Sequence, residues 1–213
     1  LYREIAREWR EQMREVAVLE VALAWRRQYC GVLSLVRDDV TYYFIDNEYY
    51  FGREGLYGHF DDGERFAFFC MAALSMLPHV DFIPDVLHAH DWQAALSVVY
   101  LNCFYRHMPE FAGIKTVFTI HNIEYQGKYD HFILGDVFAL GEEHRSLMDY
   151  NGCINLMKAA IECADAVSTV SPRYAEEIQT AEYAHGLEAC LQKNAHKLRG
   201  ILNGIDYTYY NPE

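Results

Sequence analysis

A histidine and an asparagine stand directly after a short apolar segment of this chain. Residues 115–127 read KTVFTIHNIEYQG, and residues 116–120 are apolar or β-branched throughout. A segment of this kind suits a strand buried on both faces of a parallel sheet. Because ligands of open α/β sheets bind outside the carboxyl ends of the strands, the pattern predicts that His121 and Asn122 lie at the edge of a ligand crevice. The alternative is that His121 only satisfies backbone groups at the end of the strand.

A second polar group follows residues 85–89 (DVLHA). Together with His121, the side chains of His88, His90 and Asp91 offer a possible ligand set for a metal ion. Asp91 has two other possible roles, which are to orient His121 or accept a proton, and to cap the helix that follows. The adjacent Trp92 is either a platform for a sugar ring or a packing residue under that helix.

Three further positions have weaker chemical signals. Tyr57, in a Gly-Leu-Tyr-Gly loop, is a possible hydroxyl donor to a ligand, although an ordinary loop tyrosine is the simpler interpretation. Ser171 precedes Pro172, which is the pattern of a helix N-cap followed by a first-turn proline. Because no G-x-S-x-G motif is present, a Ser/His/Asp hydrolase has little support. Asn203 and Gly204 form a turn signal after residues 198–202.

The elements that would position these residues alternate between strand and helix in the second half of the chain. Such alternation predicts a mainly parallel, doubly wound, Rossmann-like α/β sheet with right-handed crossovers. The four polar ends then meet at one edge, with Asp91, His121 and Asn203 around a common pocket. The predicted strands are 85–89, 115–120, 164–170 and 198–202, and the predicted helices include 93–107 and 172–179.

The first half of the chain has a different pattern. It predicts an antiparallel hairpin portion, in which residues 37–39 form a turn between two strands. A helix beginning at residues 61–64 should place Phe66, Phe69, Ala73 and Leu77 on a sheet and end at Pro78. The remaining predictions are a helix or turn over 1–13, strands over 14–24, 29–36 and 40–45, a loop over 46–60 and an irregular connection over 125–152.

Composition and charge exclude several classes of function. The 213 residues carry a formal net charge of −13, which argues against a nucleic-acid partner and against an anionic membrane surface. Six cysteines without C-x-x-C spacing and the lack of an 18-residue apolar run favour a protein of the reducing cytoplasm. The 17 Tyr, 12 Phe and 3 Trp residues are compatible with sugar stacking as well as with an ordinary core.

Five segments in order resemble one enzyme family. They are DVLHAHDWQ (85–93), TIHNIEYQG (119–127), ADAVSTVSPRY (164–174), HGLE (185–188) and GILNGID (200–206), and residues 41–69 are similar as well. On these motifs the chain resembles the catalytic N-terminal domain of bacterial glycogen synthases and plant starch synthases. These enzymes are retaining glucosyltransferases of the two-domain GT-B fold.

The resemblance implies a substrate pair and a set of site residues. The donor would be ADP-glucose, or less often UDP-glucose, and the acceptor the non-reducing end of an α-1,4-glucan, without a metal or another cofactor. His121 matches the family histidine near the 6-hydroxyl of the donor glucose, and Asp91 matches an aspartate important for catalysis. The positions that match the lining of the glucose pocket are Tyr57, Trp92, Asn122 and Asn203.

The chain also departs from the family pattern. The Lys-Thr-Gly-Gly-Leu loop that touches the donor phosphates would lie upstream of Leu1, and the C-terminal domain, with the family's Arg and Lys for the diphosphate and its catalytic Glu, is absent. We therefore expect residues 1–213 to be a single, incomplete catalytic N-terminal domain whose natural partner is the missing C-terminal domain. Two alternatives remain open at this stage, a non-catalytic glucan-binding module and another GT-B enzyme such as a sucrose synthase relative.

Overall fold

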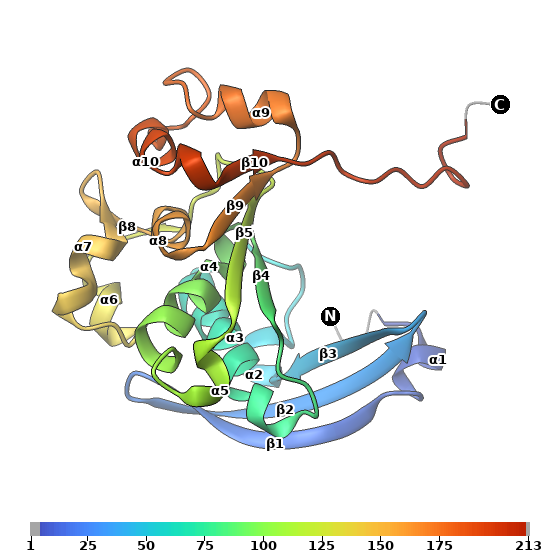
Figure 1. Cartoon of the computed structure of the whole chain (residues 1–213). Helices are drawn as coiled ribbons and strands as arrows, with labels where there is room; N and C mark the ends of the chain where they lie inside the picture. The colour runs from blue at the N-terminus through green and yellow to red at the C-terminus, as the bar shows by residue number, and fades with distance from the viewer. Residues whose placement is uncertain (1–4, 212–213) are drawn as a thin grey trace.

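The parallel sheet predicted for the second half of the chain is confirmed. In the computed structural model, which describes residues 5–211, four strands pair in the order β10-β9-β5-β4, and every pairing is parallel. Successive strands are therefore neighbours, and the chain advances across the sheet in one direction (Figure 1). The strands are β4 (Val86–His90), β5 (Lys115–Ile120), β9 (Ala166–Thr169) and β10 (Leu198–Gly200).

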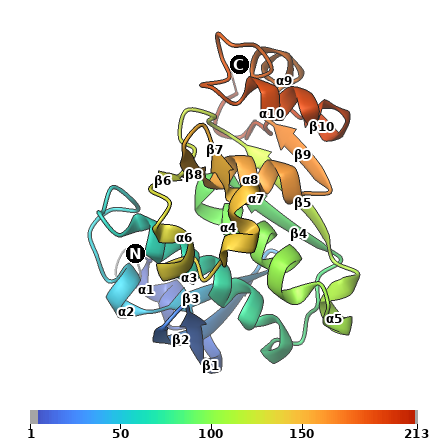
Figure 2. The ribbon, with the colours of Figure 1, turned by 90° about the vertical axis from the view of Figure 1, so that its left-hand side faces the viewer.

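The helices between these strands build the main core. Helix α4 packs against β4, β5 and α8, while α9 lies against β9 and β10. Figure 2 shows α4 and α8 in front of the sheet, on the face that is turned to the viewer. The helices of this part are α4 (Asp91–Tyr100), α5 (Pro109–Ala112), α8 (Leu156–Cys163), α9 (Pro172–Glu177) and α10 (Glu188–Lys193), with the π-helix η3 (Leu101–Tyr105) and the 3-10 helix η5 (Ala195–Lys197).

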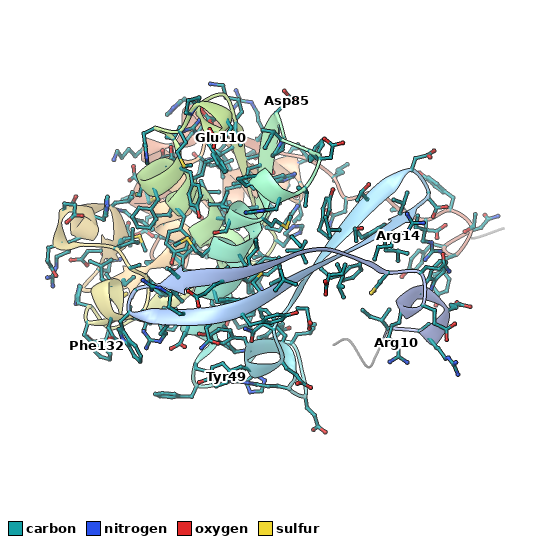
Figure 3. The ribbon with its side chains drawn as sticks, turned by 90° about the horizontal axis from the view of Figure 1, so that it is seen from below. Arg10, Arg14, Tyr49, Asp85, Glu110 and Phe132 are labelled. Carbon is teal, nitrogen blue, oxygen red and sulfur yellow. The ribbon has the colours of Figure 1, made fainter. Side chains whose placement is uncertain are left out.

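The antiparallel portion is confirmed as a three-stranded sheet in the order β1-β2-β3. The two residues between β2 and β3, Asp38 and Asp39, have φ values of 52° and 61°, which suit the tight hairpin turn that the sequence predicts. Arg14 marks the end of this sheet near α1, and Phe132 marks the opposite end (Figure 3). The elements are α1 (Arg7–Arg10), β1 (Arg14–Leu23), β2 (Arg26–Arg37), β3 (Val40–Asp46) and α2 (Glu48–Phe51). The predicted helix or turn over 1–13 is thus limited to α1, and residues 1–4 lie outside the described residues.

Helix α3 (Asp62–Ser75) joins the two sheets, and of the residues predicted to pack on a sheet, Leu77 is buried but Phe69 is not. The helix packs against β1 and β3 on one side and against α4 on the other, so its buried stripe is broad. Phe68 is fully buried, whereas Phe69 is 38% exposed. The spacing of the large aromatic residues therefore marked the edge of the stripe rather than its centre. The 3-10 helix η2 (Leu77–His79) follows, with Pro78 inside it.

The segment 125–152 has more structure than the sequence predicts. Two-residue and three-residue strands pair as a small antiparallel sheet in the order β6-β8-β7, which folds the long connection onto α8. Strands this short carry no recognisable alternation of apolar and polar residues. The elements are β6 (Lys128–Tyr129), α6 (Ile133–Asp136), η4 (Glu142–His144), α7 (Arg145–Met148), β7 (Asp149–Tyr150) and β8 (Cys153–Asn155).

All six cysteines are free thiols, and three of them, Cys30, Cys70 and Cys190, are buried. None of the helices within residues 5–211 combines the length and the apolar character that a membrane span requires.

The predicted cap of α9 is confirmed and gives a stability prediction. The Ser171 Oγ accepts a hydrogen bond from the Tyr174 backbone N–H at 2.9 Å, and Pro172 follows at the first helical position. Replacing Ser171 with alanine should lower the free energy of unfolding by about 1 kcal/mol, because one orphan N–H of the helix loses its partner. Urea denaturation measures this change. The Ser171→Asp variant keeps an acceptor and serves as the control, and equal midpoints for the two variants would contradict the role of the cap.

Candidate functional site

The site lies at the carboxyl edge of the parallel sheet, where the strands end at the same level. His90, the last residue of β4, is opposite Thr119 of β5, and Thr169, the last residue of β9, is opposite Ile120. The chain therefore leaves β4 and β5 side by side, although their ends are about 30 residues apart in sequence. His121 and Asn122 follow β5 directly and are exposed at this edge.

Asp91 connects the ends of β4 and β5. Its Oδ1 accepts hydrogen bonds from the backbone N–H groups of His121, at 2.8 Å, and Asn122, at 3.4 Å. Of the two roles considered for Asp91, capping α4 is wrong, because the cap position is held by His90, whose own side chain makes no capping hydrogen bond. The carboxylate orients the backbone at His121, not the imidazole.

The backbone of Asp91 is in an unusual conformation. Its φ is +55°, in the left-handed region that L-residues other than Asn and Asp seldom adopt. Residues in such conformations persist where the surrounding structure fixes them, and they concentrate at functional sites. Here the conformation allows a residue at the start of α4 to turn its carboxylate toward the end of β5.

The loop after His121 is fixed by Asn122 and by a buried glutamine that the sequence pattern does not single out. Asn122 Oδ1 accepts from the Glu124 backbone N–H at 3.0 Å. The buried Gln126 donates from Nε2 to the carbonyl oxygens of Ile123 and His185, each at 3.1 Å, and accepts from Asn155 Nδ2 at 2.8 Å. Nothing in the sequence separates such a buried glutamine from an exposed one, since its partners are distant in the chain.

Gly127 closes the same loop. Its φ is +66°, and a Cβ at this position would meet Trp92 Cε3 at 2.8 Å. Trp92 is partly buried against Phe66, with the ring centroids 5.1 Å apart, and against Tyr129, at 6.3 Å. These contacts match the packing alternative for Trp92, while contact of its ring with a sugar stays a prediction.

Three histidine rings stand in a row beside Asp91. The rings of His88 and His90 lie 4.2 Å apart between centroids, and His90 Nδ1 is 2.9 Å from His121 Nε2. Burial lowers the pKa of both His88 and His90 below the ordinary value of 6.5, and the neighbouring histidines lower it further. Within residues 5–211, no group of three or more His, Cys, Asp or Glu side chains could hold a metal ion. The nitrogens of His90 and His121 that face each other share a hydrogen bond instead.

Tyr57 lines a cavity that the end of β4 also lines. Tyr57 is 65% exposed, and the cavity, of about 980 Å³, is formed by β2, β3, the loop 52–57, α3 and the end of β4. The lining of the cavity includes Gln93 and His90, so the cavity extends to one of the three histidines described above. Several aromatic side chains contribute to it, namely Tyr29, Tyr43, Phe44, Phe51, Phe66 and Phe69.

Asn203 lies at the far side of the same edge. It follows β10, which is separated from β5 by β9, so two strand spacings, roughly 10 Å, lie between their ends. Pairing continues one residue past β10, through the hydrogen bond from the Ile201 N–H to the Thr169 carbonyl at 2.8 Å. Asn203 itself is exposed, and the structure brings Asp91 and His121 into contact without it.

Comparison with known proteins gives one consistent family. A family model for the starch synthase catalytic domain matches residues 1–193. The glycogen synthases of Geobacillus thermodenitrificans and Geobacillus stearothermophilus are each 50% identical over all of this chain, and that of Alkaliphilus metalliredigens is 44% identical. The chain covers 44–45% of these relatives, so it spans less than half of their length.

A solved structure gives the same result at the level of the fold. The catalytic domain of starch synthase IV from Arabidopsis thaliana, bound to ADP and acarbose, superimposes with a TM-score of 0.84 and 32% sequence identity. The match covers 94% of this chain and 42% of that structure. The parallel sheet, the antiparallel sheet and the helices around them therefore form an arrangement already known from this domain.

Proposed function

This chain belongs to the starch synthase catalytic domain family, and on that premise we propose that it is part of a glycogen synthase that transfers glucose from ADP-glucose to the non-reducing end of an α-1,4-glucan, with retention of configuration. The observation that carries the proposal is the 50% identity to two glycogen synthases over the whole chain. The ADP bound to the Arabidopsis neighbour supports an adenine nucleotide in the donor.

We assign the donor glucose to the carboxyl edge of the parallel sheet. His121 contacts the sugar near its 6-hydroxyl, and Asp91 is the second catalytic residue of this half of the site. Tyr57, Trp92, Asn122 and Asn203 line the glucose pocket. The contact between Asp91 and the backbone of His121 supports the first two assignments, and the shared cavity of Tyr57 and His90 supports a pocket that extends toward the loop 52–57.

The chemistry of the transfer explains why positioning matters here. The glycosidic bond to the diphosphate breaks through an oxocarbenium-like transition state, in which positive charge develops on the sugar and negative charge on the leaving group. Hydrogen-bond donors held in place before the reaction lower this barrier most effectively. In this chain, the imidazole of His121 and the amide of Asn122 would hold the sugar, while Asp91 fixes the backbone that carries them.

The domain organisation is part of the proposal. We infer that residues 1–213 form a single, incomplete N-terminal domain, which acts with the Lys-Thr-Gly-Gly-Leu loop and a C-terminal domain of the same enzyme. The relatives are about twice as long as this chain, which supports a second domain that holds the donor phosphates. We place the enzyme in the cytoplasm.

The isolated chain of 213 residues should not turn over substrate. Half of the groups that hold the donor would be missing, so no transfer from ADP-glucose to glycogen is expected above the blank. Incorporation of labelled glucose into glycogen measures this, with circular dichroism to verify that the chain is folded. Measurable turnover by the folded chain would contradict the proposed division of the site.

The complete enzyme provides the test of the function itself. With glycogen as acceptor, it should transfer glucose from ADP-glucose, and UDP-glucose should be the poorer donor. Calorimetry of the isolated chain with maltooligosaccharides tests the alternative, a non-catalytic glucan-binding module, because tight binding without the rest of the protein would favour the module. A complete enzyme that uses neither nucleotide sugar with glycogen would overturn the proposal.

A further inference from the structure

His90 makes a direct side-chain contact with the histidine that we place on the donor sugar. Its Nδ1 lies 2.9 Å from His121 Nε2, and the two ring centroids are 5.2 Å apart. His90 is the last residue of β4, while His121 is the first residue after β5, so the parallel register of the two strands creates the contact. One nitrogen of His121 is therefore already engaged, and only Nδ1 is left for a ligand.

Neighbouring side chains also fix the position of the His90 ring. The ring of His88 lies against the ring of His90, with the two planes tilted by 34°. His88 Nε2 lies 2.6 Å from Thr119 Oγ1, which lies 2.6 Å from Ser168 Oγ. A line of hydrogen bonds across β4, β5 and β9 thus holds the ring on which His90 rests.

The hydrogen bond between two imidazoles also limits where protons can lie. One proton occupies the space between His90 Nδ1 and His121 Nε2, and in the neutral pair a single further proton remains. If His90 donates, His121 carries that proton on Nδ1 and presents a donor to the ligand. If His121 donates, its Nδ1 is bare and presents an acceptor. The tautomer of His121 is therefore coupled to that of His90, as is common for partners of functional histidines.

We propose that His90 is a positioning residue for glucosyl transfer, which orients the imidazole of His121 and selects its tautomer toward the donor sugar. The inference rests on the proposed function. The lowered pKa of His90, caused first by burial and then by His88 and His121, agrees with a neutral His90 near pH 7. His90 also lines the cavity that contains Tyr57, so it stands between the two parts of the proposed pocket.

A double-mutant cycle in the complete enzyme tests the inference. The His90→Ala variant should lower kcat about tenfold to 100-fold, because a misplaced group near the reacting atoms has an effect of that order. If His90 acts through His121, the same substitution should change kcat by less than about twofold in a His121→Ala background, since coupled residues are not additive. Equal losses in both backgrounds would overturn the inference.

Two conservative variants make the test specific for one nitrogen. The side-chain amide of asparagine lies where Nδ1 of histidine lies, whereas that of glutamine reaches the place of Nε2. His90→Asn should therefore recover most of the activity lost in His90→Ala, and His90→Gln should not. Recovery by glutamine but not by asparagine would contradict the contact. Thermal unfolding of the asparagine variant verifies that the protein is folded.

His107 provides a matched control away from the site. It is an exposed histidine that precedes β5, so it lies toward the amino edge of the parallel sheet. His107→Asn should leave kcat within about twofold of the unsubstituted enzyme, because this residue is not part of the proposed site. A loss as large as that of His90→Ala would show a general effect of replacing a histidine and overturn the inference. Absence of transfer by the unsubstituted enzyme would overturn the proposed function as well.

Discussion

Replacing His121 with alanine in the complete enzyme should lower kcat for glucosyl transfer about 100-fold, the order of effect seen when a positioned hydrogen-bond donor is removed from a transition state. The fold should remain intact, because the side chain is exposed at the sheet edge and, within residues 5–211, its one side-chain hydrogen bond is to His90 Nδ1, at 2.9 Å. The backbone contact with Asp91 uses the N–H of residue 121, which alanine keeps.

Initial rates with ADP-glucose and glycogen measure this effect, together with thermal unfolding. His196→Ala is the matched control, because His196 is also an exposed histidine. It lies in η5, directly before β10, and so at the amino edge of the parallel sheet, opposite the site. A near-normal kcat for His121→Ala would remove this histidine from the mechanism.

Substituting Asp91 with alanine should lower kcat to a similar extent, about 100-fold, by a different route. Its Oδ1 accepts from the backbone N–H groups of His121 and Asn122, so its loss releases the turn that carries both side chains. Alanine also resists a φ of +55°, at a cost of about 1–2 kcal/mol. The Asp91→Asn variant keeps an acceptor oxygen and tolerates this conformation, so it should lose less activity than alanine.

The comparison of the two Asp91 variants separates positioning from charge. If the carboxylate acts as a base, asparagine should be as inactive as alanine. Asp39→Ala controls for the strain alone, because Asp39 has a φ of 61° in the exposed hairpin turn between β2 and β3, at a distance from the site along the antiparallel sheet. It should lose stability but keep kcat. Full activity of Asp91→Ala would contradict the role of Asp91.

Local patterns account for the parts of the fold that the sequence predicts. The alternation of residues 14–24 gives β1, with Val21 and Leu23 buried and Val18 exposed. The Ser171–Pro172 pair gives the start of α9, and the short apolar segment 115–120 gives β5 with the predicted bounds. In each case the deciding interactions lie within a few residues of the chain, which is why the pattern is readable.

The sequence-based predictions are wrong or incomplete for features that depend on contacts between distant parts of the chain. Helix α3 buries Phe68 rather than Phe69 because it packs on two layers at once, β1 and β3 on one side and α4 on the other. The small sheet of β6, β7 and β8 forms from strands too short to show a period. The motif that contains His121 carries Gln126 as well, but its burial depends on Asn155 and His185, which other elements bring to it.

The residue pattern predicts polar residues at the ends of buried strands, and the motifs identify the family. Asp91 and His121 are recognisable as candidates because residue type and strand boundaries are local properties. That Asp91 holds the backbone of His121 and that His90 holds its ring is visible only in the folded chain. These contacts depend on the parallel register of β4 and β5, in which backbone hydrogen bonds place residues about 30 positions apart opposite each other, and no side-chain pattern specifies that register.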